Sequence, residues 1–209
     1  MFFSIRLIFA CSLALLLLLS GGSWAEDRHQ AILIVGDSLS AGYGLEPDES
    51  WVALLRNRLM TEGYGHRVVN ASISGDTTGG GLRRLPRALE VHRPVIVIIE
   101  LGGNDGLRGT PVMIIRNNIA RMIEMAQDAG ARVVLAGMVM PPNYGEKYTN
   151  GFADLYIELA EDYDAGLVPF FMKGVALDPD KMQPDRIHPN AAGQPVLLDN
   201  LWPVLVDLL

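Results

Sequence analysis

Four short polar segments of the sequence carry the residue types that acyl transfer needs. The first is "GDSLS", Gly36 to Ser40, which directly follows an apolar run. The others are "NASISGDT" from Asn70, "GGNDGLRG" from Gly102 and "PDRIHPN" from Pro184. Together they offer a serine, a histidine, carboxylates, an asparagine and several glycines. A serine nucleophile requires this set: a base, a carboxylate that orients the base, and N–H donors for an oxyanion.

Ser38 is the candidate nucleophile, with His188 as its base and Asp185 as the carboxylate that fixes the imidazole tautomer. Asp185 and His188 are three residues apart, so both side chains can point the same way from a single turn. Pro189 disfavours a helix through His188. The sequence has four histidines, and only His188 lies among the candidate site residues.

Three groups are candidate donors to an oxyanion: the backbone N–H of Ser38, the backbone N–H of Gly75 and the side-chain amide of Asn104. Each residue alone also has an ordinary interpretation, because serine, asparagine and aspartate commonly form turns. Asp105, next to Asn104, leaves two alternatives open. Its carboxylate is either a second base or a brace for the turn.

Apolar runs alternate with amphipathic segments along the chain, which is typical of a parallel sheet covered by helices on both faces. The predicted strands are Ala31–Val35, Arg67–Asn70, Val95–Leu101, Arg132–Met138 and Leu167–Phe171. The predicted helices are Ser50–Met60, Leu82–Val91, Val112–Ala129, Phe152–Tyr163 and Ala192–Leu209, with Ser50 and Gly130 as caps. The sequence therefore predicts an α/β fold with about five strands, whose carboxyl edge collects the four polar segments.

The first 25 residues have the pattern of a secretory signal peptide. Arg6 precedes an apolar run from Leu7 to Leu19, and Ser23-Trp24-Ala25 provides a small-x-small cleavage site. A run of 13 residues is short for a membrane span, which needs about 20. We therefore expect residues 1–25 to be a signal peptide and residues 26–209 to form the mature domain, with an uncleaved anchor as the alternative.

Composition and motifs exclude several classes of function. A net charge of −7 without a basic run argues against nucleic-acid binding. The single cysteine, Cys11, lies in the predicted signal, so we expect no thiol chemistry. H-E-x-x-H and clustered Cys/His motifs do not occur, nor do the glycine patterns of nucleotide-binding loops. We expect no metal and no cofactor.

The blocks that contain Ser38, Gly75, Asn104 and His188 resemble the four blocks of the SGNH (GDSL) hydrolases. The longer strings "ELGGNDGLRG" and "IHPN" are similar to the bacterial branch of multifunctional thioesterase I, lysophospholipase and arylesterase enzymes. The resemblance implies a flavodoxin-like α/β/α sandwich and hydrolysis without metal or cofactor. It also implies a substrate-binding loop after the fourth strand, formed here by Pro141, Pro142, Asn143 and Tyr144. Because it is rich in proline and glycine, we expect the segment Pro141–Tyr148 to be a loop that contacts the acyl chain.

These observations predict an exported serine esterase, a monomer, that acts on acyl esters and thioesters, with lysophospholipids as further substrates. We expect it in the periplasm, with secretion as the alternative, and without a stable membrane span after signal cleavage. Two other interpretations stay open. One is a carbohydrate O-deacetylase on the same fold, and the other is a non-catalytic, flavodoxin-like binding module.

Overall fold

A parallel sheet of five strands forms the centre of the protein. The computed structural model describes residues 30–209, so the predicted signal peptide lies outside the described residues. The strand order is β2-β1-β3-β4-β5, and every neighbouring pair is parallel. The strands are β1 (Ala31–Gly36), β2 (Arg67–Asn70), β3 (Ile96–Glu100), β4 (Arg132–Ala136) and β5 (Gly166–Val168). All five predicted strands are present, and the parallel α/β prediction is confirmed.

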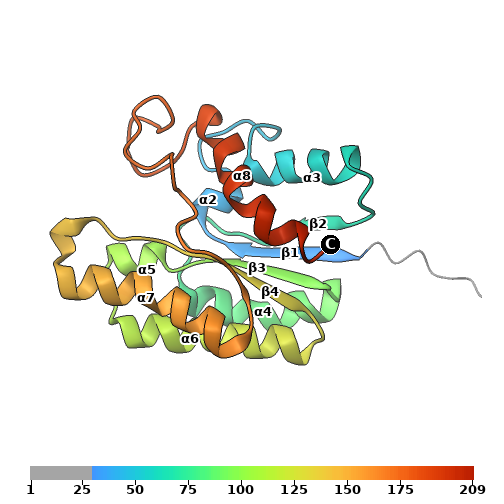
Figure 1. Cartoon of the computed structure of the whole chain (residues 1–209), viewed down its shortest axis with the longest axis horizontal. Coiled ribbons are helices and arrows are strands. Elements are labelled where there is room, and N and C mark those ends of the chain that lie inside the picture. The colour runs from blue at the N-terminus through green and yellow to red at the C-terminus, as the bar shows by residue number, and fades with distance from the viewer. Residues whose placement is uncertain (1–29) are drawn as a thin grey trace, which may run out of the picture.

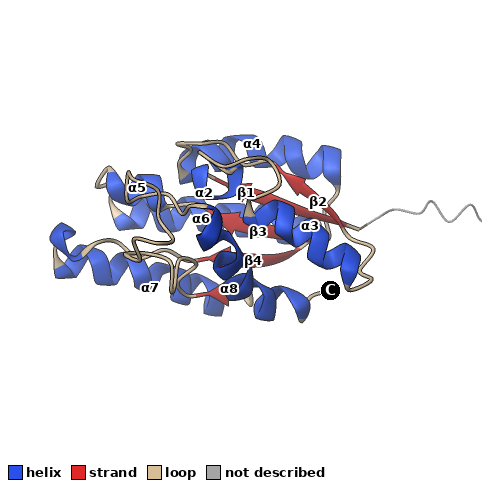
Figure 2. Ribbon diagram, turned by 90° about the horizontal axis from the view of Figure 1, so that it is seen from above, coloured by secondary structure: helices blue, strands red, loops and turns tan. Residues whose placement is uncertain are grey.

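Helices cover both faces of the sheet and complete a three-layer α/β/α sandwich (Figure 1). One layer contains α3 (Trp51–Thr61) and α8 (Gln194–Val206), which pack against each other. The opposite layer contains α4 (Thr78–His92), α6 (Val112–Asp128) and α7 (Glu146–Tyr163). Seen from above, α3 and α8 overlie the strands, as expected for a layer of helices stacked on one face of the sheet (Figure 2). Because both faces are covered, every residue of β1 and β3 is buried, which explains why these strands lack polar alternation.

Capping side chains determine where several helices begin. The Ser50 hydroxyl accepts a hydrogen bond from the Ala53 N–H, so Ser50 is the N-cap that the sequence predicts. Helix α4 begins four residues earlier than predicted, because the Thr77 hydroxyl accepts from the Gly80 N–H and starts the helix within a run of glycines. None of the helices within residues 30–209 is long and apolar enough to cross a membrane.

Other predicted boundaries are wrong as well, among them the end of β5 and the start of α7. Strand β5 ends at Val168 rather than at Phe171, because Pro169 has no N–H to continue the ladder. The segment Pro141–Tyr148 is not wholly a loop. Pro142–Tyr144 forms the 3-10 turn η1, and α7 already begins at Glu146, six residues before the predicted start.

The carboxyl edge of the sheet carries all four polar segments of the sequence. Strand β1 leads into the short helix α2 (Ser38–Ala41), and β2 leads into the loop 71–77. Strand β3 leads into the short helix α5 (Gly103–Leu107), and a long segment after β5 leads through the 3-10 turn η2 (Ala191–Gly193) into α8. Since the strands are parallel, these four connections leave the same edge, as the alternation of elements predicts.

Candidate active site

Ser38 is the first residue of α2, immediately after the buried strand β1. The preceding residue, Asp37, caps this helix by accepting a hydrogen bond from the Leu39 N–H at 3.1 Å. The turn from strand to helix leaves Ser38 half-buried at the carboxyl edge. The side chain can therefore meet both a substrate and a residue from another segment.

The residue from another segment that meets Ser38 is His188. Its Nε2 lies 2.8 Å from the Ser38 Oγ, although 150 residues separate the two in the chain. Its Nδ1 lies 2.7 Å from the Asp185 Oδ2. With the proton on Nδ1, His188 presents an Nε2 lone pair to the serine hydroxyl, the arrangement in which a histidine can act as a general base.

The turn from Asp185 to His188 is held by its own carboxylate. Asp185 Oδ1 accepts from the backbone N–H groups of Ile187 and His188, at 2.9 and 3.0 Å. Arg186 lies between them in the left-handed region, with φ of +57°. Hydrogen bonds from the backbone and from the imidazole of His188 lower the pKa of Asp185 to about 2. This carboxylate is therefore ionised at neutral pH and can orient and stabilise the imidazole.

Gly75 presents its backbone N–H from the loop that follows β2. Its φ is +79°, in the left-handed region that favours glycine, and nothing lies within 4 Å of where a Cβ would stand. Conformation rather than crowding therefore explains the glycine at this position. No hydrogen bond among residues 30–209 uses the Gly75 N–H, so it is available to a ligand.

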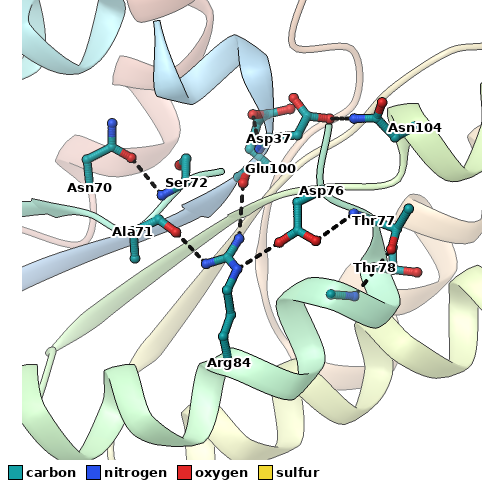
Figure 3. A network of polar contacts seen from close by, with 12 residues as sticks. Asp37, Asn70, Ala71, Ser72, Asp76, Thr77, Thr78, Arg84, Glu100 and Asn104 are labelled. Carbon is teal, nitrogen blue, oxygen red and sulfur yellow. Dashed lines mark hydrogen bonds and ion pairs between the residues drawn. The ribbon is translucent and has the colours of Figure 1, made fainter. Parts of the chain in front are cut away.

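Asn104, in α5, donates one of its two amide N–H groups to the Asp37 Oδ2 at 2.9 Å (Figure 3). The amide is half-buried, and its second N–H has no protein acceptor within residues 30–209. Because an ionised carboxylate can only accept hydrogen bonds, the nitrogen end of the Asn104 amide must face Asp37. The contact thus prepares Asn104 to donate a hydrogen bond to a negative oxygen.

Asp105 is a brace and not a second base. Its side chain is buried, and its two oxygens accept from the Thr78 N–H and the Thr78 hydroxyl, both at 2.8 Å. Asn118 donates to the same hydroxyl at 3.0 Å. These bonds fasten the start of α4 to α5, and so connect the loop that carries Gly75 to the turn that carries Asn104.

Asp37 and Glu100 are two buried acids beneath the site, and the sequence patterns predicted a role for neither. Burial raises the pKa of Asp37 to about 6, against the opposing effect of its bonds from Leu39 and Asn104. Burial, with the charge of Asp37, raises the pKa of Glu100 well above its ordinary value. Glu100 Oε2 accepts from the Ser40 hydroxyl at 2.6 Å. A charged residue that ends an otherwise apolar buried strand is the sequence signal that could have identified Glu100.

An aromatic ring also bounds the site. The Tyr43 ring lies against the His188 ring, with centroids 4.5 Å apart. Both residues, together with Ser38, line a small hollow at this edge of the sheet. Within residues 30–209 no group of three or more His, Cys, Asp or Glu side chains is placed to hold a metal ion.

The predicted substrate loop lies over α5 rather than against Ser38 and His188. Pro141, Pro142 and Asn143 are exposed, and the Tyr144 hydroxyl donates to the Leu107 carbonyl at 3.0 Å. Tyr144 lines an open groove of about 580 Å³ together with Val112, Tyr148 and Gly151, among other residues. Ser38 does not line this groove. The structure thus leaves Pro141–Tyr144 beside α5. The other predicted site residues all lie at the carboxyl edge of the sheet: Ser38, Gly75, Asn104, Asp185 and His188.

Comparison with known proteins identifies the family. The model of the GDSL-like lipase/acylhydrolase family matches residues 34–196, and the chain belongs to this family of hydrolases. Esterase TesA of Pseudomonas aeruginosa is 50% identical over 184 residues, which are 88% of this chain and 92% of that protein. Thioesterase 1/protease 1/lysophospholipase L1 of Escherichia coli K12 is 44% identical over 168 residues, 80% of this chain and 79% of that protein.

A solved structure agrees with the fold. The crystal structure of TesA superposes with a TM-score of 0.84 at 52% sequence identity, and covers 86% of this chain and 100% of that one. The predicted resemblance to SGNH hydrolases and the three-layer α/β/α fold are both confirmed. The chain is therefore a hydrolase of this family, and the relatives named above are an esterase and a thioesterase/lysophospholipase.

Proposed function

We propose that the protein is an exported serine esterase that hydrolyses acyl esters and thioesters through an acyl-enzyme at Ser38. One observation carries the proposal. Ser38, His188 and Asp185 form an unbroken chain of hydrogen bonds of 2.8 and 2.7 Å, with the imidazole between the hydroxyl and an ionised carboxylate. This is the arrangement that activates a serine for acyl transfer.

In the first half-reaction the Ser38 Oγ attacks the acyl carbon while its proton moves to His188 Nε2. The tetrahedral intermediate then expels the alcohol or thiol, which takes the proton from His188, and the acyl group stays on Ser38. In the second half-reaction His188 removes a proton from water, the water oxygen attacks the acyl carbon, and the acid leaves as Ser38 regains its proton. Asp185 keeps the imidazole in place and stabilises its cationic form.

Three donors would stabilise the negative oxygen of each intermediate: the backbone N–H groups of Ser38 and Gly75 and the Asn104 amide. The free N–H of Gly75 and the amide fixed by Asp37 support this role. Donors that are already oriented lower the barrier, because no reorganisation is needed when the charge develops.

The substrate class follows the relatives' names, which include esterase, thioesterase and lysophospholipase. We propose that Pro141, Pro142, Asn143 and Tyr144 contact the acyl chain, since Tyr144 lines the groove beside α5 and the other three directly precede it in the chain. Rates on a short aryl ester, a long-chain acyl-CoA, a lysophospholipid and an acetylated sugar would rank these substrates. A clear preference for the acetylated sugar would favour a carbohydrate O-deacetylase instead.

A fluorescent organophosphonate tests the mechanism directly. The probe should label one residue, and peptide mapping should find the label on Ser38. Ser38→Ala should abolish both labelling and turnover, whereas the matched change Ser74→Ala, in an exposed loop residue, should alter neither. Labelling at Ser40, Ser72 or Ser74 would refute the assignment. Tight nucleotide or flavin binding without esterase activity would favour a binding module.

We also propose that residues 1–25 are a signal peptide, that residues 26–209 are the mature domain, and that this domain is a periplasmic monomer. The basic start, the apolar run and the small residues before Glu26 support this. N-terminal sequencing of the protein from a periplasmic extract should begin at Glu26. Protein that keeps its first 25 residues and stays with the membrane fraction would favour an uncleaved anchor.

A further inference from the structure

Beneath the candidate active site, one guanidinium holds two of the connections that form it. Arg84 lies in α4, and its side chain is 21% exposed. Its Nε contacts the Asp76 Oδ2 at 2.7 Å, and its Nη2 donates to the Gly36 carbonyl at 3.1 Å. Its Nη1 donates to the Ala71 carbonyl. Figure 3 shows this side chain reaching up from the helix between Ala71 and Asp76.

The three partners of Arg84 belong to the connections that carry Ser38 and Gly75. Gly36 is the last residue of β1, two residues before Ser38. Ala71 begins the loop that carries Gly75, and Asp76 directly follows Gly75. The guanidinium therefore ties both ends of the Gly75 loop to the end of the strand that carries the nucleophile.

The Gly75 loop has other attachments as well. Arg108 Nη2 donates to the Gly75 carbonyl at 3.2 Å, and the Ser72 N–H donates to the Asn70 Oδ1 at 3.1 Å. Ala71 N–H donates to the Ile34 carbonyl and Ile73 N–H to the Gly36 carbonyl, which fixes the start of the loop on β1. Residues 73–75 are exposed. Directly downstream of Gly75, the side chain of Asp76 anchors the loop, two residues before the Thr78–Asp105 contact. Its Oδ2 meets Arg84, and its Oδ1 accepts from the Thr77 N–H at 2.9 Å.

Gly80 in α4 leaves the space that the contact between Asp76 and Arg84 needs. A Cβ on Gly80 would lie 1.6 Å from the Asp76 Oδ1, so a side chain at that position would expel the carboxylate. Asp76 is largely buried by its surroundings, with 13% of its side chain exposed. A buried carboxylate of this kind needs its cation, and a planar guanidinium can bond it and two carbonyls at once, which a lysine ammonium on a flexible stem does less well.

We propose that Arg84 is a positioning residue that sets the Gly75 N–H at a fixed place relative to Ser38, and so sharpens stabilisation of the oxyanion. The inference rests on the proposed function, in which Gly75 is an oxyanion donor. Arg84 acts through the loop and does not touch the substrate. Small displacements of such donors reduce catalysis strongly, because the hydrogen bond must match the transition state.

The first test compares Arg84→Lys and Arg84→Ala with a control in the same helix. Arg87→Ala is the control, because Arg87 is 75% exposed and, among residues 30–209, pairs only with Glu90 on the surface. Active sites are titrated with the organophosphonate, so that rates refer to folded enzyme. We expect kcat on a short aryl ester to fall roughly 10-fold or more in Arg84→Lys and up to about 100-fold in Arg84→Ala. These losses do not exceed the roughly 10²–10³-fold loss for complete removal of one oxyanion donor, because the Gly75 N–H is displaced and not removed. KM should change less than twofold, and Arg87→Ala should match wild type.

The second test asks whether Arg84 acts through Gly75. Gly75→Ala meets open space but forces alanine into a left-handed conformation, so it displaces the N–H without filling a cavity. If both changes disturb the same donor, the double variant Arg84→Ala/Gly75→Ala should be little slower than the slower single variant. Arg84→Ala combined with Asn104→Ala should be close to additive, because the Asn104 donor is held by Asp37.

A normal kcat per titrated site in Arg84→Lys and Arg84→Ala would overturn the inference, and so would full additivity between Arg84→Ala and Gly75→Ala. If Arg84→Ala does not fold, the Arg84→Lys rate decides alone. Ser38→Ala separates this failure from failure of the proposed function. Active Ser38→Ala enzyme would refute the mechanism itself, whereas an inactive Ser38→Ala with normal Arg84 variants would refute only the role of Arg84.

Discussion

The buried carboxyl of Asp37 should make the stability of this protein fall as the pH rises toward neutrality. Asp37 is 3% exposed and lies beside Glu100, whose Oε2 is 3.4 Å from the Asp37 backbone nitrogen. Burial raises the pKa of Asp37 from 3.8 to about 6. A carboxyl whose pKa is raised on folding binds more protons in the folded state than in the unfolded state. Its contribution to stability is therefore complete below pH 4 and is lost as the pH rises through 6.

The size of the effect follows from the pKa shift. A change from 3.8 to about 6 corresponds to about 3 kcal/mol of folding free energy. For a domain of this size, that loss lowers the melting temperature by roughly 6–12 °C. Glu100 acts in the same direction, because its pKa is also raised by burial and by the charge of Asp37. Asp185 acts in the opposite direction but only below pH 4, since its pKa is lowered to about 2.

Comparison with Asp37→Asn isolates the Asp37 contribution. The asparagine cannot ionise, so its effects on packing and hydrogen bonding give an offset that is nearly constant with pH. Urea unfolding of wild type and variant at intervals from pH 4 to pH 7.5 would give the free energy of unfolding for each. We expect the stability of wild type, relative to the variant, to fall by about 3 kcal/mol across this range.

Parallel stability curves for wild type and Asp37→Asn would refute this reasoning. Such a result would mean that the carboxyl titrates alike in the folded and unfolded states, despite its burial. If wild type instead becomes more stable relative to Asp37→Asn as the pH rises, the bonds from Leu39 and Asn104 lower the pKa of Asp37 by more than burial raises it. Glu100→Gln serves as the control that separates the two neighbouring acids.

Three further outcomes concern activity. Asn104→Ala should lower kcat roughly 10²–10³-fold with little change in KM. Asn104→Asp should be at least as slow, because it replaces a donor with an anion facing Asp37. More activity in Asn104→Asp than in Asn104→Ala would mean that this side chain only holds the turn. Asp185→Asn should keep its melting temperature near wild type but lose most of its kcat, since His188 loses the carboxylate 2.7 Å from Nδ1; a wild-type rate would point to another orienting group. Tyr144→Ala should change the preference among acyl-chain lengths more than the rate on acetyl esters, and an equal loss on every chain length would argue against a binding role.

The fold was largely predictable from the sequence because it depends on patterns that repeat along the chain. Apolar runs without polar alternation mark strands buried on both faces, and all five predicted strands are present. Boundaries were less predictable where one residue or one cap decides them. Pro169 ends β5 early, and Thr77 starts α4 early, and neither effect changes the periodicity of its neighbours.

The residues of the candidate site were predictable for a similar reason, whereas the residues that hold them were not. Ser38, Gly75, Asn104 and His188 each follow a strand or precede the last helix, so topology alone brings them to one edge. Arg84 gave no comparable signal. It stands beside Arg83 in an amphipathic helix, and only the three-dimensional structure shows that Arg84 reaches Asp76 while Arg83 remains exposed on the surface.

The position of Asp37 shows why a costly buried acid is kept beside a centre that must stabilise negative charge. An asparagine amide can present either its oxygen or its nitrogen, and only the nitrogen stabilises an oxyanion. The Asp37 carboxylate selects the nitrogen, because it attracts the Asn104 Nδ2 at 2.9 Å and would repel the amide oxygen. In Asp37→Asn that selection is lost, since the new side chain can face Asn104 with either end. Asp37→Asn should therefore remove the pH-dependent loss of stability but lower kcat. Opposite effects on stability and activity are expected where a site is organised for function at the expense of stability. An Asp37→Asn variant with wild-type kcat would show that Asn104 is oriented by other contacts.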